Sequence, residues 1–325
     1  MIPFRYSRAG SVREACRASS DPTTAVLAGG TELLNWMRLG VNAPEHLVDI
    51  KAVGGLSDIQ VRDDVVHIGA LNTLNKVAAH PEVRARFPVL TESIEMAASA
   101  QLRNLATIGG NPLQSTRCPY YRHEGPTPCN KRRPGSGCAA RDGITDNQAI
   151  FGWTDDCVAV QPSDPATALV ALDAQFHTEA PDGGRRIPAR ELHMLPDEDP
   201  NRHHILRPGE IITTIQIPGS AARSGYLKVR ERASYEFATV AVAAALELDD
   251  GVISRARLAL GSVALRPWRL DVTEQLLVGL RPESAQVEAA VAAGFANARG
   301  LPGNEHKIIL ARNATLRAVR EVANR

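Results

Sequence analysis

The chain has 325 residues, of which 44% are hydrophobic and 22% charged, as expected of a globular protein with two or three domains. Its 37 basic and 36 acidic residues create no field that would attract nucleic acid, and aromatic residues, at 4%, leave little material for stacking bases. No apolar run reaches the roughly 20 residues of a membrane-spanning helix. We therefore expect neither nucleic-acid binding nor membrane insertion.

The first 55 residues predict an α/β unit. A helix is expected near residues 11–18, a short buried strand at 25–27, a helix from Leu33 and a strand at 46–50. Gly29, Gly30 and Thr31 lie between the first strand and the second helix, an arrangement that directs backbone amides at an anion such as phosphate. Such a turn often does no more than end a strand, and the GxGxxG fingerprint of a Rossmann nucleotide site is absent from the sequence.

A second glycine turn follows further along the chain. Before it, the pattern predicts two short strands within residues 59–68 and helices at 73–79 and 89–100, with Pro81 as an interruption. The turn itself, at Gly109 and Gly110, also has a hydroxyl nearby, on Thr107. A diphosphate needs donors on more than one side, so the two turns together favour a diphosphate site more than either does alone.

Four of the five cysteines lie in a segment that lacks an apolar pattern, at Cys118, Cys129, Cys138 and Cys157. The segment is rich in proline, glycine and charge, so it cannot order itself by burying apolar surface. We expect a metal centre or disulfides to hold it. The basic run between the second and third cysteines, Lys131 to Arg133, could offset the charge of such a centre, contact a partner or be solvated.

The spacing of these cysteines favours an iron-sulfur cluster over the alternatives. The gaps of 10, 8 and 18 residues are unlike the close pairs typical of zinc sites, and four thiolates are the ligands of a [4Fe-4S] cluster. Disulfides would fit an exported protein, but the opening MIPFRYSRAG has neither an apolar signal region nor a twin-arginine pair. Zinc, disulfides and free thiols remain open alternatives.

The remainder predicts strands flanked by helices. A helix at 166–172 precedes strands within 171–188 that surround a turn at 181–184, and another strand is expected at 210–218. After the linker GSAARSG, the pattern predicts strands at 225–230, 244–249 and 256–261 and helices at 237–242, 273–277, 285–298 and 307–324. We expect Cys16 to be a small core residue. His203 and His204 should lie in a surface loop, and Tyr235 should take a core or interface position rather than stack on a flavin.

Four stretches resemble one protein family. They are AGGTELL (28–34), ATIGGNPLQSTRCPYY (106–121), PSDPATALVALDA (162–174) and KVRERASYEFATVAVAAAL (228–246). Together they resemble the FAD-binding subunit of the xanthine oxidase family of molybdenum hydroxylases, and the resemblance covers nearly the whole chain. The cysteine segment is similar to that of the members whose flavin subunit carries a [4Fe-4S] cluster. The greatest similarity is to flavin subunits of bacterial periplasmic-type aldehyde oxidoreductases, and the next is to that of 4-hydroxybenzoyl-CoA reductase.

The resemblance implies an α+β fold in three parts. Residues 1–55 and 56–220 would be the two subdomains of a FAD-binding domain of the vanillyl-alcohol-oxidase/PCMH type, with the [4Fe-4S] loop at 115–160 inserted in the second. Residues 225–325 would form a C-terminal α+β domain of the CO dehydrogenase flavoprotein type.

The resemblance also implies the cofactor sites. The FAD contacts would be Leu27, Ala28, Gly29, Gly30, Thr31, Glu32, Leu33, Leu34, Thr107, Gly109, Gly110, Asn111, Arg117, Asp164 and Lys228, and the cluster ligands Cys118, Cys129, Cys138 and Cys157. Asp164 would contact the adenosine part, although the sequence alone equally allows a turn or helix cap, and Lys228 could simply be solvated. Pro112 stands where the family more often has leucine or isoleucine.

The implied function is electron transfer. No Ser-His-Asp arrangement, carboxylate pair or nucleophile elbow is evident, so we expect no catalytic residue in this chain. Electrons would pass from [2Fe-2S] clusters in a small partner subunit through FAD to a small-molecule or protein acceptor, while a large partner subunit oxidises an aldehyde at its molybdopterin cofactor. The alternatives are a 4-hydroxybenzoyl-CoA reductase subunit with the reverse electron flow, and a zinc-stapled interaction subunit without enzymatic function. The location would be cytoplasmic, or periplasmic through co-export with a signal-bearing partner.

Overall fold

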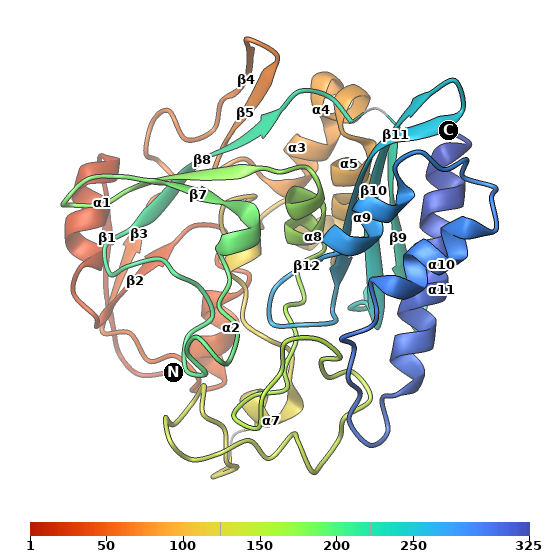
Figure 1. Cartoon of the computed structure of the whole chain (residues 1–325). Coiled ribbons are helices and arrows are strands. Elements are labelled where there is room, and N and C mark those ends of the chain that lie inside the picture. The colour runs from red at the N-terminus through yellow and green to blue at the C-terminus, as the bar shows by residue number, and fades with distance from the viewer. Residues whose placement is uncertain (124, 222) are drawn as a thin grey trace.

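The computed structural model describes residues 1–123, 125–221 and 223–325. Within these residues the strands form three sheets, drawn from successive stretches of the chain (Figure 1). The first sheet is parallel and has the order β1-β3-β2. Its elements are β1 (Arg5–Arg8), α1 (Val12–Ser19), β2 (Thr24–Leu27), α2 (Leu33–Arg38) and β3 (His46–Asp49). The predicted α/β order of this unit is confirmed, and the Ser11 hydroxyl caps α1 by accepting from the Glu14 amide.

The second sheet is antiparallel, with the order β4-β5-β8-β6-β7. Its strands are β4 (Ile59–Arg62), β5 (Val65–Gly69), β6 (Gln175–Glu179), β7 (Arg186–Pro188) and β8 (Ile211–Pro218), and the helical turn η2 (Ala189–Glu191) follows β7. The turn between β4 and β5 falls on Asp63 and Asp64, as predicted, and both adopt positive φ. Buried side chains of β5 and β8 form one core with the helices described next.

Five helices are associated with the second sheet; four of them share its core, and two were not predicted as separate helices. They are α3 (Leu74–Ala79), α4 (Pro81–Arg86), α5 (Pro88–Glu95), α6 (Ala100–Arg103) and α8 (Asp164–Ala171). The sequence did not predict α4: Pro81 begins a helix, because its fixed φ suits the first helical position. The single helix predicted over 89–100 is wrong at its end, because Ala98 has φ +47° and separates α5 from α6.

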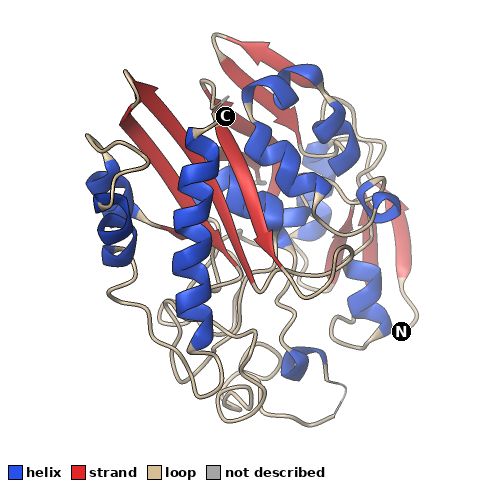
Figure 2. Cartoon of the chain, turned by 90° about the vertical axis from the view of Figure 1, so that its right-hand side faces the viewer, coloured by secondary structure: helices blue, strands red, loops and turns tan. Residues whose placement is uncertain are grey.

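The third sheet is antiparallel, with the order β12-β11-β10-β9. Its elements are β9 (Ser224–Val229), β10 (Val240–Asp249), β11 (Val252–Gly261), β12 (Trp268–Arg269), α9 (Asp271–Leu277), α10 (Gln286–Ala293) and α11 (His306–Ala323). Figure 2 shows the long helix α11 lying along the sheet, and α11 contacts β9 and β10. Helices α5 and α8 also pack against strands of this sheet.

The helix predicted over 237–242 is wrong, because that segment leads into β10. Every residue from Val240 to Leu246 is buried, and the strand lies between β9 and β11. An alanine and valine run buried in this way has neither the alternation of a half-exposed strand nor the stripe of a surface helix. Tertiary packing therefore decides the outcome against the helix propensity of alanine.

The cysteine segment forms irregular loops between η1 (Asn111–Leu113) and α8, at the bottom of Figure 1. Between these two elements, the described residues contain one helix, α7 (Pro119–Arg122), and no strand. The end of the segment rests on the C-terminal part of the chain, where the Asn304 amide donates to the carbonyls of Gln148 and Ala149. Across the described ranges, no helix is both long and apolar enough to span a bilayer.

Candidate functional site

The first glycine turn offers a row of free backbone donors. It joins β2 to α2, and Gly30 has φ +74°. A Cβ on Gly29 would lie 2.0 Å from the Leu105 carbonyl oxygen, so only glycine fits there. Among the described residues, the amides of Gly29, Gly30 and Thr31 donate no hydrogen bond to the protein. Successive unpaired amides beside a helix N-terminus form an anion-binding cradle.

The second glycine turn packs behind the first, since Leu105 and Ala106 lead into it. Its own amides are paired within the protein: Gly109 donates to the Ala70 carbonyl at 2.9 Å, and Gly110 donates to the Thr107 hydroxyl at 3.3 Å. A Cβ on Gly109 would lie 2.6 Å from the Ala70 Cβ. The turn therefore contributes shape and side chains to the site, and the free backbone donors come from the first turn.

Glu32 and Arg117, both predicted cofactor contacts, bind each other. The two guanidinium nitrogens of Arg117 lie 2.8 and 2.7 Å from the carboxylate oxygens of Glu32. The same carboxylate accepts from the Ser115 amide at 2.9 Å and from the Trp36 indole at 2.5 Å. Because these partners belong to α2 and to the start of the cysteine segment, the pair fastens the first turn to that segment.

Asp164 and Lys228 also meet, in a buried ion pair of 2.8 Å. Asp164 further accepts from the Tyr226 hydroxyl at 2.8 Å, and burial raises the pKa of its carboxyl while Lys228 opposes that rise. The cap of α8 is Ser163, whose hydroxyl accepts from the Ala166 amide, so Asp164 is not the cap residue. Lys228 is buried rather than solvated.

A hydrogen bond connects this ion pair to the second turn. The Ser163 hydroxyl, next to Asp164, donates to the Asn111 side chain at 2.6 Å. The carbonyl of Pro112, the residue that departs from the family pattern, accepts from His193 at 2.7 Å and from Gln161 at 3.2 Å. The predicted residues thus form two groups: Glu32 and Arg117 beside the first turn, and Asp164 and Lys228 beyond the second.

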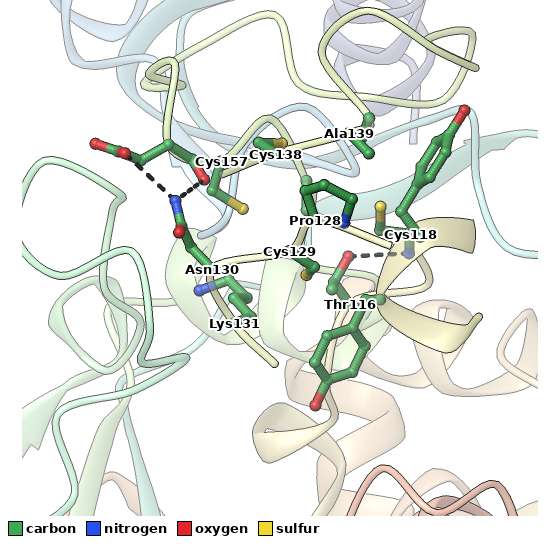
Figure 3. A pocket seen from close by; sticks show the side chains of 14 residues that line it. Thr116, Cys118, Pro128, Cys129, Asn130, Lys131, Cys138, Ala139 and Cys157 are labelled. Carbon is green, nitrogen blue, oxygen red and sulfur yellow. Dashed lines mark hydrogen bonds between the residues drawn. The ribbon is translucent and has the colours of Figure 1, made fainter. Parts of the chain in front are cut away.

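The four predicted cysteine ligands line one cavity (Figure 3). They come from different parts of the loop segment, and all four are free thiols. Burial raises the pKa of the Cys118 thiol to about 11 and that of Cys157 to about 12, and it also raises the pKa of Cys129. In the described part of the chain, no group of three or more His, Cys, Asp or Glu side chains is placed to hold a single metal ion.

Hydrogen bonds of the Asn130 side chain connect three of the loop segments that carry the cysteines. It follows Cys129, its side-chain oxygen accepts from the Gly137 amide at 3.0 Å, and its amide donates to the Asp156 carbonyl at 3.0 Å. Gly137 precedes Cys138 and Asp156 precedes Cys157. The buried Asn130 side chain therefore sets the relative positions of three thiols.

Two further polar side chains support the same cavity. The Gln148 amide nitrogen lies 3.7 Å from the Cys118 sulfur, to which it donates. Lys307, on α11, is fully buried and donates to the carbonyls of Asn147 and Gln148 at 3.1 and 2.8 Å. Sequence reasoning missed Asn130, Gln148 and Lys307. A polar residue adjacent to a cysteine is a weak signal for Asn130, and nothing in the sequence indicates the contact of Lys307, 159 residues away from Gln148.

The predictions for single residues can be compared with their environments in the structure. His203 and His204 are half-buried, and desolvation lowers the pKa of both. His203 packs edge-on against Tyr121, with ring centroids 5.5 Å apart. The prediction that they lie in a loop is confirmed, although neither side chain is fully exposed. Tyr235 is 57% exposed, which excludes a core position in this chain. Cys16 is buried, as predicted.

Comparison with known proteins places this geometry in a family. The family described as "FAD binding domain in molybdopterin dehydrogenase" matches residues 2–220, and the "CO dehydrogenase flavoprotein C-terminal domain" matches residues 225–322. The chain is 40% identical over 316 residues to the aldehyde oxidoreductase FAD-binding subunit PaoB of Escherichia coli, covering 96% of each. The chain is the FAD-binding subunit of a molybdenum hydroxylase of the xanthine oxidase family.

Solved structures share the fold of this flavin subunit over its length. A chain of the CO dehydrogenase of Hydrogenophaga pseudoflava is 27% identical, with a TM-score of 0.74 and coverage of 98% of this chain and 97% of that one. A chain of the reconstituted CO dehydrogenase of Oligotropha carboxidovorans has a TM-score of 0.78 at 24% identity, covers 100% of both chains and supports the fold alone. The flavin subunit belongs to an oxidoreductase complex.

The described residues offer backbone donors that suit FAD and thiols of the kind that iron-sulfur clusters use. The free amides of the first turn suit the diphosphate of FAD, and a side chain at Gly29 would fill the cradle. Four unpaired thiols around one cavity match the donor set of a [4Fe-4S] cluster.

Proposed function

We propose that this chain is the electron-transfer flavoprotein subunit of a heterotrimeric, molybdenum-dependent aldehyde oxidoreductase. The observation that carries the substrate class is the 40% identity to an aldehyde oxidoreductase flavin subunit over 96% of both chains. Electrons from [2Fe-2S] clusters of a small partner would reach an external acceptor by way of the FAD, and the aldehyde would react at the molybdopterin of a large partner. Residues 1–55, 56–220 and 225–325 would be its three parts, the first two forming a PCMH-type domain.

The first glycine turn would hold the FAD diphosphate. The amides of Gly29, Gly30 and Thr31 would donate to phosphate oxygens, while Leu27 and Leu34, which lie within 3.3 Å of a Cβ built on Gly30, would close the turn on its apolar side. Glu32 keeps the turn in place through Arg117. Bound FAD supplies storage for two electrons that can be exchanged singly.

Thr107, Gly109 and Gly110 would shape the second wall of the flavin site, and Asn111 would be held in place there by Ser163. Asp164 and Lys228 would act on the cofactor as a neutralised pair, because each is the other's counter-ion. Leu33 and Ala28 complete the set of proposed contacts.

The loop 115–160 would bind a [4Fe-4S] cluster through Cys118, Cys129, Cys138 and Cys157. Support comes from their shared cavity, their free thiols and the Asn130 bonds that hold three of them in register. Co-export with a signal-bearing partner would place the protein in the periplasm; without such a partner it would be cytoplasmic.

Metal, sulfide and flavin analysis of the purified chain tests both cofactor proposals. We expect about four irons with acid-labile sulfide and one FAD per chain. Replacing Cys129 by serine should remove the iron, whereas Cys16→Ser, at a buried cysteine outside the cavity, should retain it. Stoichiometric zinc in place of iron would refute the cluster, and a colourless protein would refute the flavin site.

The substrate class is tested on the complete complex co-expressed with its partners. We expect reduction of the flavin by aldehydes, followed by its reoxidation when an acceptor is added. A complex that reduces its flavin with no aldehyde, or that transfers electrons only from a low-potential donor to an aromatic thioester, would overturn the aldehyde oxidoreductase proposal.

A further inference from the structure

The one lysine that lines the cysteine cavity forms no ion pair among the described residues, and Asp199 acts on its charge only from beyond ion-pair distance. Lys131 shares the cavity with all four cysteines. Its ammonium donates to the carbonyl oxygens of Pro200 and Arg202, at 3.1 and 2.7 Å. Both acceptors are neutral, so they fix the position of the positive charge without cancelling it.

Such a charge is unfavourable in the absence of a counter-ion. Removing an ammonium from water costs several kcal/mol unless a negative charge compensates it. Asp156 also lines the cavity, but it is exposed, and its carboxylate accepts from the Asn130 amide at 3.3 Å. The other groups in the cavity that could carry negative charge are the four cysteine thiols, which would do so as ligands of a cluster.

We propose that Lys131 is the fixed counter-charge of the iron-sulfur cluster and raises its reduction potential. The inference rests on the proposed function, because it requires a cluster on the four cysteines. A thiolate-held cluster carries net negative charge, and one added electron makes it more negative. A cation held beside the cluster stabilises the reduced form more than the oxidised form, since the attraction grows with the charge.

The two hydrogen bonds of Lys131 should make its effect on the cluster potential stronger than that of Arg133. They connect the cysteine loop to the segment at 200–202 and hold the half-buried Lys131 ammonium beside the cavity, where water screens it less than it screens a fully exposed charge. Arg133, two residues along the chain, is exposed and donates to the Pro126 carbonyl at 2.9 Å. Its charge is screened by water and salt. Of the basic run, Lys131 is the residue that lines the cavity, and it is therefore the one expected to act on the cluster.

The test is a redox titration of the iron-loaded full-length chain, followed by electron paramagnetic resonance. Lys131→Met removes the charge, Lys131→Gln removes it but keeps a donor for a carbonyl, and Arg133→Met is the matched control. We expect both Lys131 variants to keep their iron and to favour the oxidised cluster at least tenfold more than the wild type, a shift of 59 mV to lower potential for one electron. Arg133→Met should leave the potential unchanged.

The salt dependence of the potential separates the half-buried charge of Lys131 from a fully exposed charge. The shift caused by Lys131→Gln should largely persist at high ionic strength, because salt screens a half-buried charge at the cavity less than an exposed one. An unchanged potential in an iron-loaded Lys131→Gln chain, or an equal shift in Arg133→Met, would overturn this inference alone. A wild-type chain without iron would overturn the cluster proposal, and this inference with it.

Discussion

Lys307 should make the free energy of unfolding depend on pH, and the substitution Lys307→Met should remove this dependence. The side chain is fully buried at the start of α11 and donates to two backbone carbonyls. Burial lowers its pKa from 10.5 to about 7. The positive end of the helix dipole adds to the penalty on the ammonium.

The magnitude and sign follow from this lowered pKa. Between pH 7 and pH 10.5 the unfolded chain holds a proton that the folded chain has released, so the free energy of unfolding increases with pH across this window. The 3.5-unit difference (10.5 − 7) corresponds to about 5 kcal/mol of destabilisation, fully present below pH 7 and lost as the pH rises to 10.5. Lys307→Met lacks this destabilisation but loses the hydrogen bonds, at a cost of about 1–3 kcal/mol at every pH.

The assay is thermal unfolding of the wild type and Lys307→Met at pH 7 and pH 9.5, followed by tryptophan fluorescence. From pH 9.5 to pH 7, the difference in unfolding free energy should move by about 3 kcal/mol in favour of the variant, seen as several degrees in Tm. Lys76→Met, at an exposed position on α3, is the control and should show no such change. Parallel pH curves for the wild type and Lys307→Met would refute the assignment of a lowered pKa.

Three further changes test the remaining contacts. Gly29→Ala should abolish FAD retention during purification, because the added Cβ would lie 2.0 Å from a backbone carbonyl oxygen. The control Gly54→Ala has open space for its Cβ and should retain FAD, as measured by flavin absorbance. Asp164→Asn should lower the unfolding free energy by about 3–5 kcal/mol, because it leaves the Lys228 ammonium buried without its partner. The double variant Asp164→Asn, Lys228→Met should regain part of the lost unfolding free energy. A double variant that is less stable than Asp164→Asn alone would contradict the pairing. Gln148→Leu should keep the iron but lower the cluster potential, because a hydrogen bond to a ligand sulfur is lost; an unmoved potential in a redox titration would show that this bond has no influence.

The sequence by itself determined the local structure around the cofactor residues. Strand, glycine turn and helix at residues 25–38 were predicted from hydrophobic pattern and glycine placement, because both depend on neighbours in the chain. The grouping of four cysteines in one segment without an apolar pattern also marked the loop that depends on something other than hydrophobic burial. These are properties that a short window of sequence contains.

Only the tertiary structure decided which polar groups partner one another. Glu32 pairs with Arg117, 85 positions away, and Asp164 pairs with Lys228, 64 positions away. All four residues were predicted to contact the cofactor, and in the structure they form internal ion pairs. The same holds for the start of β10, which was predicted as the end of a helix over 237–242, whereas the strand predicted over 244–249 lies within β10. The packing of α5, α8 and α11 on β10 decides for the strand. Burial and long-range pairing arise from the packed chain as a whole, so no local pattern determines them.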